Sequence, residues 1–387
     1  MKKEKMVKME IYLLFFMFFC IVACSDNNTP DNDDNINVFG DIEWIRESQN
    51  DGIIITGYRG KGGVVDIPAE IDGSHVTVIE EYAFREKNIT DITIPNTVTH
   101  IKACAFQSNK LINLTIPDSV TVIKKYVFAG NQLTSVNLGK NLISIGYGAF
   151  SANKLRSIII PDSVVSIEEE AFRGSRNGNQ LTNVVIGNGV TDIGRRAFSN
   201  NQITNLTIGN SVETIGIAAF ESSNLTKLTL PNSVRYIELN AFRDNQLTSV
   251  TIPDSVIVIE NNAFDENKLT SVIIGNGVIN IGDQAFRGSF LNPLLNNIII
   301  GNKVRSIGKE AFRYNKLKSI IIPNSVKFIG KDAFANGELS FITIGANVTF
   351  RELDPYPSSF EDFYNNNGKA SGIYKRNDVN YKWEKIE

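Results

Sequence analysis

The stretch "NQLTSVTIPDSVIVIENNAFDE", residues 245–266, decides the fold, because close copies of it fill most of the 387-residue chain. Its most constant feature is an Ala-Phe pair, in which valine replaces the alanine once, at Val127. The phenylalanine recurs twelve times, at nine intervals of 22 residues and two of 26. Self-similarity at such a period indicates a repeat architecture. The twelve positions are Phe84, Phe106, Phe128, Phe150, Phe172, Phe198, Phe220, Phe242, Phe264, Phe286, Phe312 and Phe334.

The general unit, NxLTxLxIPxSVxxIxxxAFxx, predicts two short strands separated by a turn. Leu247, Val250 and Ile252 form an apolar set whose last two members alternate, which is typical of a strand with one buried face. Pro253 lacks an amide hydrogen and ends this strand, and a second apolar pair follows the turn. We expect Asn245 at a tight corner, in a left-handed backbone conformation.

One unit cannot bury its own apolar face, whereas stacked units bury each other's faces and pair identical strands in parallel. The alanine beside each phenylalanine sets a small residue next to a large one, as close packing between layers requires. The sequence therefore predicts a mainly β solenoid with parallel ladders, about 22 residues per coil and about 13 coils.

The unit resembles a known family. LxxLxI resembles the strand segment of leucine-rich repeats, and the whole unit, with IPxSV and IxxxAF, closely resembles the BspA-type leucine-rich repeats of bacterial surface proteins. The resemblance covers about residues 62–350 and implies a leucine-rich-repeat solenoid. The chain departs from the commonest form in having no cysteine after Ala-Phe and in using IGN for IP, as at Gly187 and Gly209. Relatives are associated with binding host matrix proteins, coaggregation or host cells, so the resemblance implies adhesion.

Both flanks break the repeat and predict caps for the ends of the solenoid. In residues 41–61, alternating runs on either side of "QNDG" predict a β-hairpin that turns around Asp51. In residues 351–387, "SSFEDFYNNNGK" predicts a short helix and "GIYKRNDVNYKWEKI" predicts two strands. Trp44 and Trp383 lie in these caps, where we expect them to cover an exposed apolar layer; the alternative is a role as ligand platforms.

Residues 1–23 predict a lipoprotein signal peptide. A lysine-rich start leads into about 13 apolar residues, fewer than the roughly 20 of a bilayer span, although a transmembrane segment is the alternative. "IVAC", which ends at Cys24, resembles a bacterial lipobox and marks Cys24 as the lipidation site. Residues 24–40 are mostly acidic and Asn-rich, which predicts a flexible tether.

An acidic stretch after the lipidated cysteine also resembles the surface export signal of lipoproteins in some Gram-negative anaerobes. We therefore expect a lipid-anchored outer-membrane protein on the cell surface, with a location on the periplasmic face as the alternative.

The two 26-residue intervals contain insertions that both begin Arg-Gly-Ser, at Arg173 and Arg287. Extra residues at an interior corner must bulge outward, so we expect both loops to protrude from the same edge of the solenoid. The second loop, "RGSFLNPLLNN", offers Phe290, Leu291 and Pro293 as a candidate protein contact. The alternative is that these apolar side chains fold back over the edge of the coil.

The repeat also predicts which side chains face outward from the first strand, namely the third and fifth letters of LxxLxI. Along the stack these letters form rows of Ser, Thr, Asn and β-branched residues with little charge. Such a surface lacks the aromatic faces typical of sugar sites and the basic rows of polyanion sites, and it suits contact with proteins. The alternative is that Thr and Ser simply make good strand surfaces. The candidate binding residues on this face are Asn183, Asn205, Lys227 and Ser249.

The sequence offers no support for a catalytic, metal or cofactor site. His75 and His100, the two histidines, lack cysteine or acidic clusters at ligand spacing. Cys104 is interpreted as a small packing residue, and with Cys20 in the signal and Cys24 lipidated, no intramolecular disulfide is expected. The net charge of -3 argues against nucleic acid as a partner.

Two short polar patterns have local explanations. The Asp-Ser-Val triplets that begin at Asp118, Asp162 and Asp254 resemble an O-glycosylation motif of some anaerobic Gram-negative bacteria, but they also form the turn of the repeat. The acidic run 168–170 is expected in the solvated part of IxxxAF.

Two functional hypotheses follow. The first is a surface-anchored adhesion module that is held on the membrane by its lipid. Its solenoid would bind host extracellular-matrix or cell-surface proteins, or other bacterial surface proteins. The second is a structural cell-envelope spacer or assembly component without a dedicated external ligand.

Overall fold

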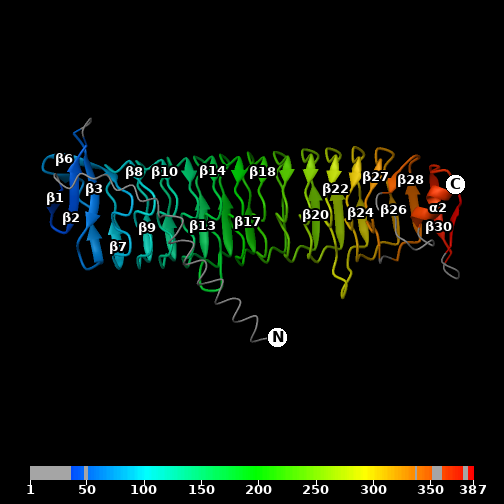
Figure 1. Cartoon of the computed structure of the whole chain (residues 1–387), viewed down its shortest axis with the longest axis horizontal. Helices are drawn as coiled ribbons and strands as arrows, with labels where there is room; N and C mark the ends of the chain where they lie inside the picture. Colours follow the sequence, from blue (N-terminus) through cyan, green and yellow to red (C-terminus); the bar gives the residue numbers. More distant parts are fainter. Residues whose placement is uncertain (1–35, 48–50, 336–337, 351–359, 378–381) are drawn as a thin grey trace.

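The computed structural model describes residues 36–47, 51–335, 338–350, 360–377 and 382–387. They form a long, flattened stack of coils that runs from the blue end to the red end of the chain (Figure 1). The fold predicted from the repeat is confirmed: it is a mainly β solenoid of about 13 coils with parallel ladders. The predicted signal peptide, Cys24 and the tether up to residue 35 lie outside the described residues.

Most coils start with a main strand that holds part of LxxLxI. In β20 (Ser249–Ile252), Val250 and Ile252 are buried while Ser249 and Thr251 are exposed, as the two-residue alternation requires. This strand pairs in parallel and in register with β22 (Ser271–Ile274) of the next coil. The other main strands are β4 (Gly63–Asp66), β7 (Ile89–Thr93), β9 (Asn113–Thr115), β11 (Ser135–Asn137), β13 (Ser157–Ile160), β15 (Asn183–Ile186), β17 (Asn205–Thr207), β24 (Asn297–Ile299), β26 (Ser319–Ile321) and β28 (Phe341–Ile344).

The main strands are divided among separate short sheets rather than forming one ladder. From β13 onward, the strands of four residues have Val or Ile at both inward positions. Leu228 and Leu230 occupy these positions in the coil between β17 and β20, and this segment forms no strand. Leucine has a lower β-strand propensity than Val and Ile, which agrees with the absence of a strand here. The two leucines pack into the coil although the segment forms no strand.

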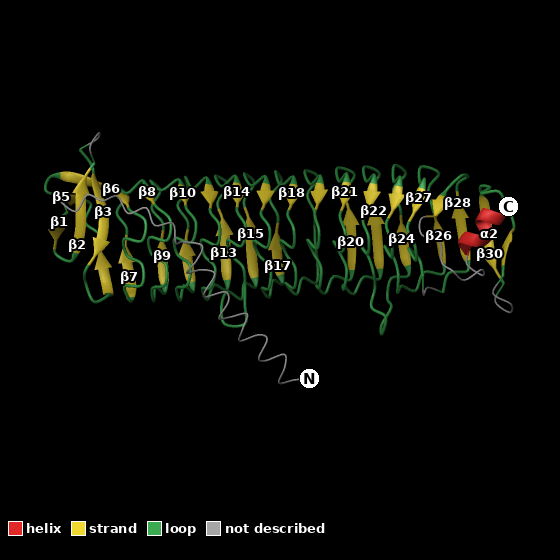
Figure 2. Cartoon of the chain, viewed as in Figure 1, coloured by secondary structure: helices red, strands yellow, loops and turns green. Residues whose placement is uncertain are grey.

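A second strand of two residues follows the turn and builds the more continuous ladder. In β21 (Val258–Ile259), Ile259 is buried and lies in register with Ile237 and Ile281 of the adjacent coils. Figure 2 shows these short strands in yellow along the whole stack. The others are β8 (His100–Ile101), β10 (Val122–Ile123), β12 (Ser144–Ile145), β14 (Ser166–Ile167), β16 (Asp192–Ile193), β18 (Thr214–Ile215), β19 (Tyr236–Ile237), β23 (Asn280–Ile281), β25 (Ser306–Ile307), β27 (Phe328–Ile329) and β29 (Thr349–Phe350).

The phenylalanines of the Ala-Phe slot form a continuous stack through the core. Eleven successive ring pairs, from Phe84 to Phe334, have centroids 5.1 to 5.6 Å apart and interplanar angles of 2° to 14°. Rings that are nearly parallel at this separation are offset, which is a favourable aromatic arrangement. The repeat period is thus the distance along the chain between two stacked rings.

The predicted left-handed conformation of Asn245 is wrong. The left-handed residue is its neighbour Asp244, with φ of 56°, whereas Asn245 is buried. Its Nδ2 donates to the carbonyl oxygens of Phe220 (2.8 Å) and Phe242 (3.1 Å), and its Oδ1 accepts from the Leu225 amide (2.9 Å). The role of asparagine here lies in its side chain, which satisfies backbone groups that the corner leaves without partners. The buried equivalents are Asn109, Asn131, Asn153, Asn179, Asn201, Asn267 and Asn315.

The N-terminal cap is the predicted hairpin, formed by β2 (Ile42–Arg46) and β3 (Ile53–Tyr58). Trp44 is buried in it, which agrees with a covering role. One boundary is wrong: residues 37–39, expected in the tether, form β1 (Asn37–Phe39) and pair with β2. Two further strands, β5 (Glu70–Ile71) and β6 (Ser74–Ile79), form a small antiparallel hairpin within the first coil.

The C-terminal cap contains the predicted helix and two strands. Helix α2 (Phe360–Asn366) has acidic residues in its first turn, and β30 (Gly372–Arg376) and β31 (Trp383–Lys385) are antiparallel. Trp383 packs against Phe360 with ring centroids 4.9 Å apart. The hydroxyl of buried Tyr364 donates to the Gly345 carbonyl oxygen at 2.6 Å, which ties the helix to the last coil. The cap thus covers the apolar end of the stack.

Candidate protein-binding surfaces

The predicted binding residues of the first strand lie on the outer face of the main strands, called here the main-ladder face. Asn183 is half-buried and pairs in register with exposed Asn205. Ser249 is exposed and pairs with Ser271. Lys227 is exposed too, but it lies in the coil that forms no strand. The structure therefore places these residues on one face without bringing them into a single cluster.

An apolar patch occupies the C-terminal third of the same face. Ile273, Ile299 and Ile321 hold the fifth letter of LxxLxI in three successive coils, and Phe341 holds the third letter in the next coil. These four side chains are between 40% and 70% exposed. The register of β22 with β24 sets Ile273 beside Ile299. We call these four residues the isoleucine row.

The rule that the third and fifth letters of LxxLxI face outward applies to Ile273 and Phe341, but the row itself was not predicted from the sequence. The signal was available, because Thr207, Thr229 and Thr251 hold the fifth letter in the three preceding coils. The change from threonine to isoleucine at one letter of the repeat, over three consecutive coils, is what marks the patch.

Both insertion loops project from the same edge of the stack, as predicted, and Figure 1 shows them at the lower edge in green and yellow. The second loop exposes its apolar tip: Phe290 is 70% and Leu291 is 90% exposed. The alternative, in which these two side chains fold back over the coil, is wrong. Phe290 lies edge-on to Tyr314, with ring centroids 5.3 Å apart, and this contact orients the ring.

The base of the second loop is fixed by an ion pair. The Arg287 guanidinium donates to both carboxylate oxygens of Asp265, each at 2.9 Å, and the Asp265 side chain is almost fully buried. This hydrogen bonding raises the pKa of Arg287 above its usual value. The ion pair therefore holds the base of the loop, and the exposed apolar side chains at the tip take no part in it.

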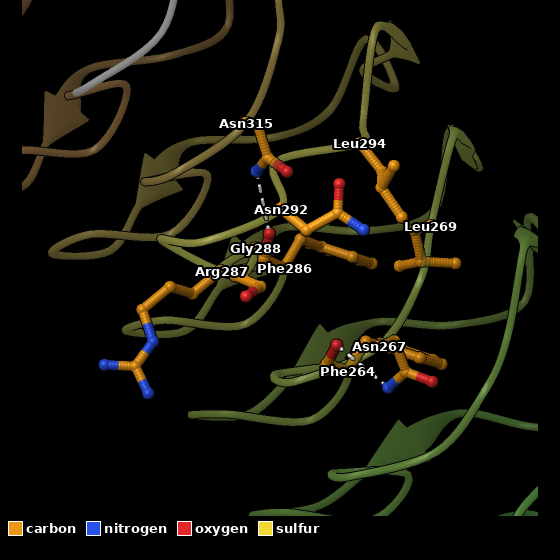
Figure 3. Close-up of a pocket in the computed structure, with 10 residues that line it drawn as sticks. Phe264, Asn267, Leu269, Phe286, Arg287, Gly288, Asn292, Leu294 and Asn315 are labelled. Atoms are coloured by element: carbon orange, nitrogen blue, oxygen red, sulfur yellow. Dashed lines mark hydrogen bonds between the residues drawn. The ribbon is translucent and has the colours of Figure 1, made fainter.

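Pro293 has a structural position that the sequence did not reveal. It lies two residues before Leu295, where most coils place the buried asparagine, so the row of asparagines is interrupted there, as it also is at Ser223. Figure 3 shows a cavity close to this position, with a volume of about 10 Å³, which is lined by Asn267 and Asn315 among others. Pro293 is half-buried and is less accessible than Phe290 and Leu291.

The remaining polar residues singled out from the sequence lie in structural settings. His75 and His100 are exposed, and Cys104 is buried. Within the described residues, no group of three His, Cys, Asp or Glu side chains is placed to hold a metal ion. In the same part of the chain, no helix is both long and apolar enough to cross a membrane.

The structure also bears on two local predictions, which concern the acidic run 168–170 and the Asp-Ser-Val triplets. Glu170 is buried rather than solvated and pairs with Arg173 at 2.8 Å. In the Asp-Ser-Val turns, the hydroxyls of Ser119 and Ser163 donate to carbonyl oxygens of the preceding coil at 2.5 and 2.7 Å. These hydrogen bonds give the first two triplets a structural role in stacking, whereas the buried Ser255 hydroxyl of the third triplet has no hydrogen-bond partner in the described part of the chain.

The repeating coil, its stacked phenylalanines and its buried asparagines define a leucine-rich-repeat solenoid, a scaffold that is typically non-enzymatic. The BspA type leucine rich repeat region matches residues 69–179, 176–292 and 240–361, in six copies. The chain belongs to this family.

Solved structures of bacterial proteins are similar to this chain. A leucine-rich repeat protein from Bacteroides ovatus is 24% identical over 81% of this chain and 90% of its own, with a TM-score of 0.54. A leucine rich cell surface protein from Faecalibacterium prausnitzii is 25% identical over 84% and 91%, with a TM-score of 0.43. The pneumococcal vaccine antigen PcpA is 19% identical over 81% and 82%, with a TM-score of 0.45. The first similarity supports the fold. No curated protein matches the sequence.

Proposed function

We propose that the chain is a surface-anchored adhesion module that binds host or bacterial surface proteins on its main-ladder face. Leucine-rich repeat proteins generally mediate protein interactions, and a protein described as a cell surface protein is among the similar structures. The isoleucine row is the observation that carries the proposal. The polar half of the face, with Asn183, Asn205, Lys227 and Ser249, extends the surface toward the N-terminal cap.

The isoleucines of the row are not explained by strand formation alone. Threonine and isoleucine are both β-branched and both suit an exposed strand, and the fold uses threonine at this letter in the three coils before the row. An exposed isoleucine leaves more apolar surface in water than threonine does, and it lacks the hydroxyl that threonine offers to water. Contiguous exposed apolar surface on a soluble protein marks an interaction site. A partner protein that covers the row would bury it.

Replacing Ile299 and Ile321 together with aspartate is expected to weaken binding of an extracellular partner at least tenfold, about 1.4 kcal/mol. The reason is that two carboxylates would have to lose their hydration in the contact. Biolayer interferometry of the full chain against a panel of extracellular-matrix and bacterial surface proteins measures this.

The matched control is Ile159→Asp, which changes the same letter of the repeat at a residue that is 66% exposed but lies outside the row. It should leave binding unchanged. Equal binding by the double variant and the parent chain would contradict the proposed face. If no protein of the panel binds, the structural spacer becomes the better account.

We further propose that Cys24 carries the lipid anchor of an outer-membrane protein displayed on the cell surface. Replacing Cys24 with serine removes the thiol that is acylated, and buried acyl chains contribute about 0.8 kcal/mol per methylene to membrane binding. The variant should therefore move from the membrane fraction to the soluble fraction, as followed by immunoblotting. Retention of the variant in the membrane would contradict the anchor.

Display on the cell surface is tested by a separate experiment, protease treatment of intact cells. Protease added to intact cells should cleave the parent chain. Cleavage that occurs only after lysis would place the protein on the periplasmic side and would remove the basis for adhesion.

A further inference from the structure

We propose that copies of this chain associate through the second insertion loop, which enters a hollow on the second-strand side of another copy. The knob is defined as residues 287–294, with Phe290 and Leu291 at its tip. The hollow is defined by Ile217, Tyr236 and Leu239 together with its flanking glutamates. The partner is a second copy of the chain, so this proposal does not depend on the external protein proposed above.

The apolar tip of the knob is not needed to close the inserted loop. The first insertion has the same length and begins with the same Arg-Gly-Ser, yet its exposed tip consists of Ser175, Arg176 and Asn177. A polar tip therefore closes such a loop equally well. Phe290 and Leu291 expose apolar surface on a projection that is convex, and a convex apolar projection fits a concave apolar site.

Three exposed lysines lie in the coils on either side of the knob. Lys268 and Lys316 hold, in the coils before and after, the position that Leu294 holds in the knob coil, and Lys318 lies two residues beyond Lys316. The backbone of Lys316 bonds to the Leu295 carbonyl oxygen at 2.8 Å, which fixes this register. Within the described residues, none of the three lysines forms an ion pair, so their charges are available to a partner.

The hollow lies near the middle of the stack, on the side of the second strands. It has a volume of about 360 Å³, and Ile217, Tyr236 and Leu239 are each about two-fifths exposed along it, at 37% to 44%. Several other coils place smaller polar residues at the position of Tyr236, for example Ser144 and Thr214, although Phe328 holds it nearer the C-terminal cap. The hollow is thus a second local departure from the repeat, as the knob is.

Two glutamates flank the hollow. Glu238 and Glu260 line it, and neither forms an ion pair with another described residue. The knob therefore presents apolar side chains with unpaired lysines in the adjacent coils, and the hollow presents apolar side chains flanked by glutamates. Contact between the two would bury both apolar surfaces and pair opposite charges, which also orients the approach of the two copies.

The arrangement of the two sites determines the kind of assembly. Knob and hollow lie on different coils and are different surfaces, so their contact is heterologous and leaves one knob and one hollow free at the two ends of every assembly. A contact of this kind adds further copies instead of stopping at a closed dimer. On a cell surface it would link neighbouring anchored chains into a lateral array.

Sedimentation velocity of the purified full chain in mild detergent, over a series of concentrations, tests the proposal. The parent chain should form dimers and larger species as its concentration rises. Leu291→Asp disables the knob and Leu239→Arg disables the hollow. Each variant should be monomeric where the parent associates, with association weakened tenfold or more.

Mixing the two variants tests directly whether the knob of one copy binds the hollow of another. The Leu239→Arg chain keeps its knob and the Leu291→Asp chain keeps its hollow, so an equimolar mixture should form dimers and nothing longer. Ile159→Asp, which changes another exposed isoleucine, should associate as the parent does. All three changed side chains are on the surface, so unchanged thermal unfolding will show that the variants are folded.

A parent chain that stays monomeric at every concentration would overturn the proposal. So would variants that associate as the parent does, or a mixture that yields no dimers. None of these results bears on the isoleucine row, which is tested by its own variants.

Discussion

Asn245→Ala is expected to lower the free energy of unfolding by at least about 3 kcal/mol, because each of three buried backbone groups left without a partner costs roughly 1 to 3 kcal/mol. The groups concerned are the carbonyl oxygens of Phe220 and Phe242 and the amide of Leu225, which the Asn245 side chain bonds at 2.8, 3.1 and 2.9 Å. Alanine cannot replace any of these hydrogen bonds. Urea unfolding followed by circular dichroism measures the change.

A matched control separates the buried asparagine from asparagine in general. Asn205 is exposed on a main strand, so Asn205→Ala should change the free energy of unfolding by less than about 0.5 kcal/mol. Hydrogen exchange adds a local readout, because the Leu225 amide should exchange faster in Asn245→Ala. Equal effects of the two substitutions would contradict the role given to the buried asparagines.

Phe264→Ala is expected to lower the free energy of unfolding by about 3 to 5 kcal/mol, the usual cost of removing a buried phenylalanine. The ring is fully buried and stacks on Phe242 and Phe286, with centroids 5.3 and 5.2 Å away. Its removal leaves a cavity between two coils and breaks both ring contacts. Thermal and urea unfolding report the loss.

Phe290→Ala is the control for this second substitution. It removes the same side chain from the exposed tip of the knob, so stability should change little. Loss of stability that is similar in Phe264→Ala and Phe290→Ala would mean that the stacked rings are not the core of the solenoid.

The fold was predictable from the sequence because one physical requirement repeats in every coil. Each coil must bury Leu, Val, Ile and Phe against the same letters of its neighbours, so the period and the two-residue alternation report the stack directly. The edge from which the loops project followed from the same reasoning, because both insertions occupy the same position in the unit.

Features that depend on side-chain depth were not predictable in this way. Asparagine suits a tight corner either through its backbone or through its amide, and the sequence does not distinguish the two uses. Only the structure shows that Asn245 bonds to backbone groups of two adjacent coils. The same holds for Pro293. It stands in the slot of the buried asparagines, and the hydrogen bonds of those asparagines are visible only in the structure.

The sequence predicted the candidate binding surfaces only in part. Exposure of Phe290 and Leu291 could not be decided, because a short loop can either project or fold back. The isoleucine row required a comparison of one letter across successive coils, which isolated residues did not suggest. The hollow around Tyr236 is formed by how far the side chains of neighbouring coils extend from the surface. The repeat pattern in the sequence does not predict it.

Hydroxyl-radical footprinting of the full chain, with and without a bound extracellular protein, tests the central claim most directly. The proposed function predicts that the partner protects Ile299, Ile321 and Phe341, while Ile159 on the same face and Ile143 on the second-strand side keep their reactivity. Protection at Ile143 or Ile159 without protection of the isoleucine row would contradict the assignment of the binding surface.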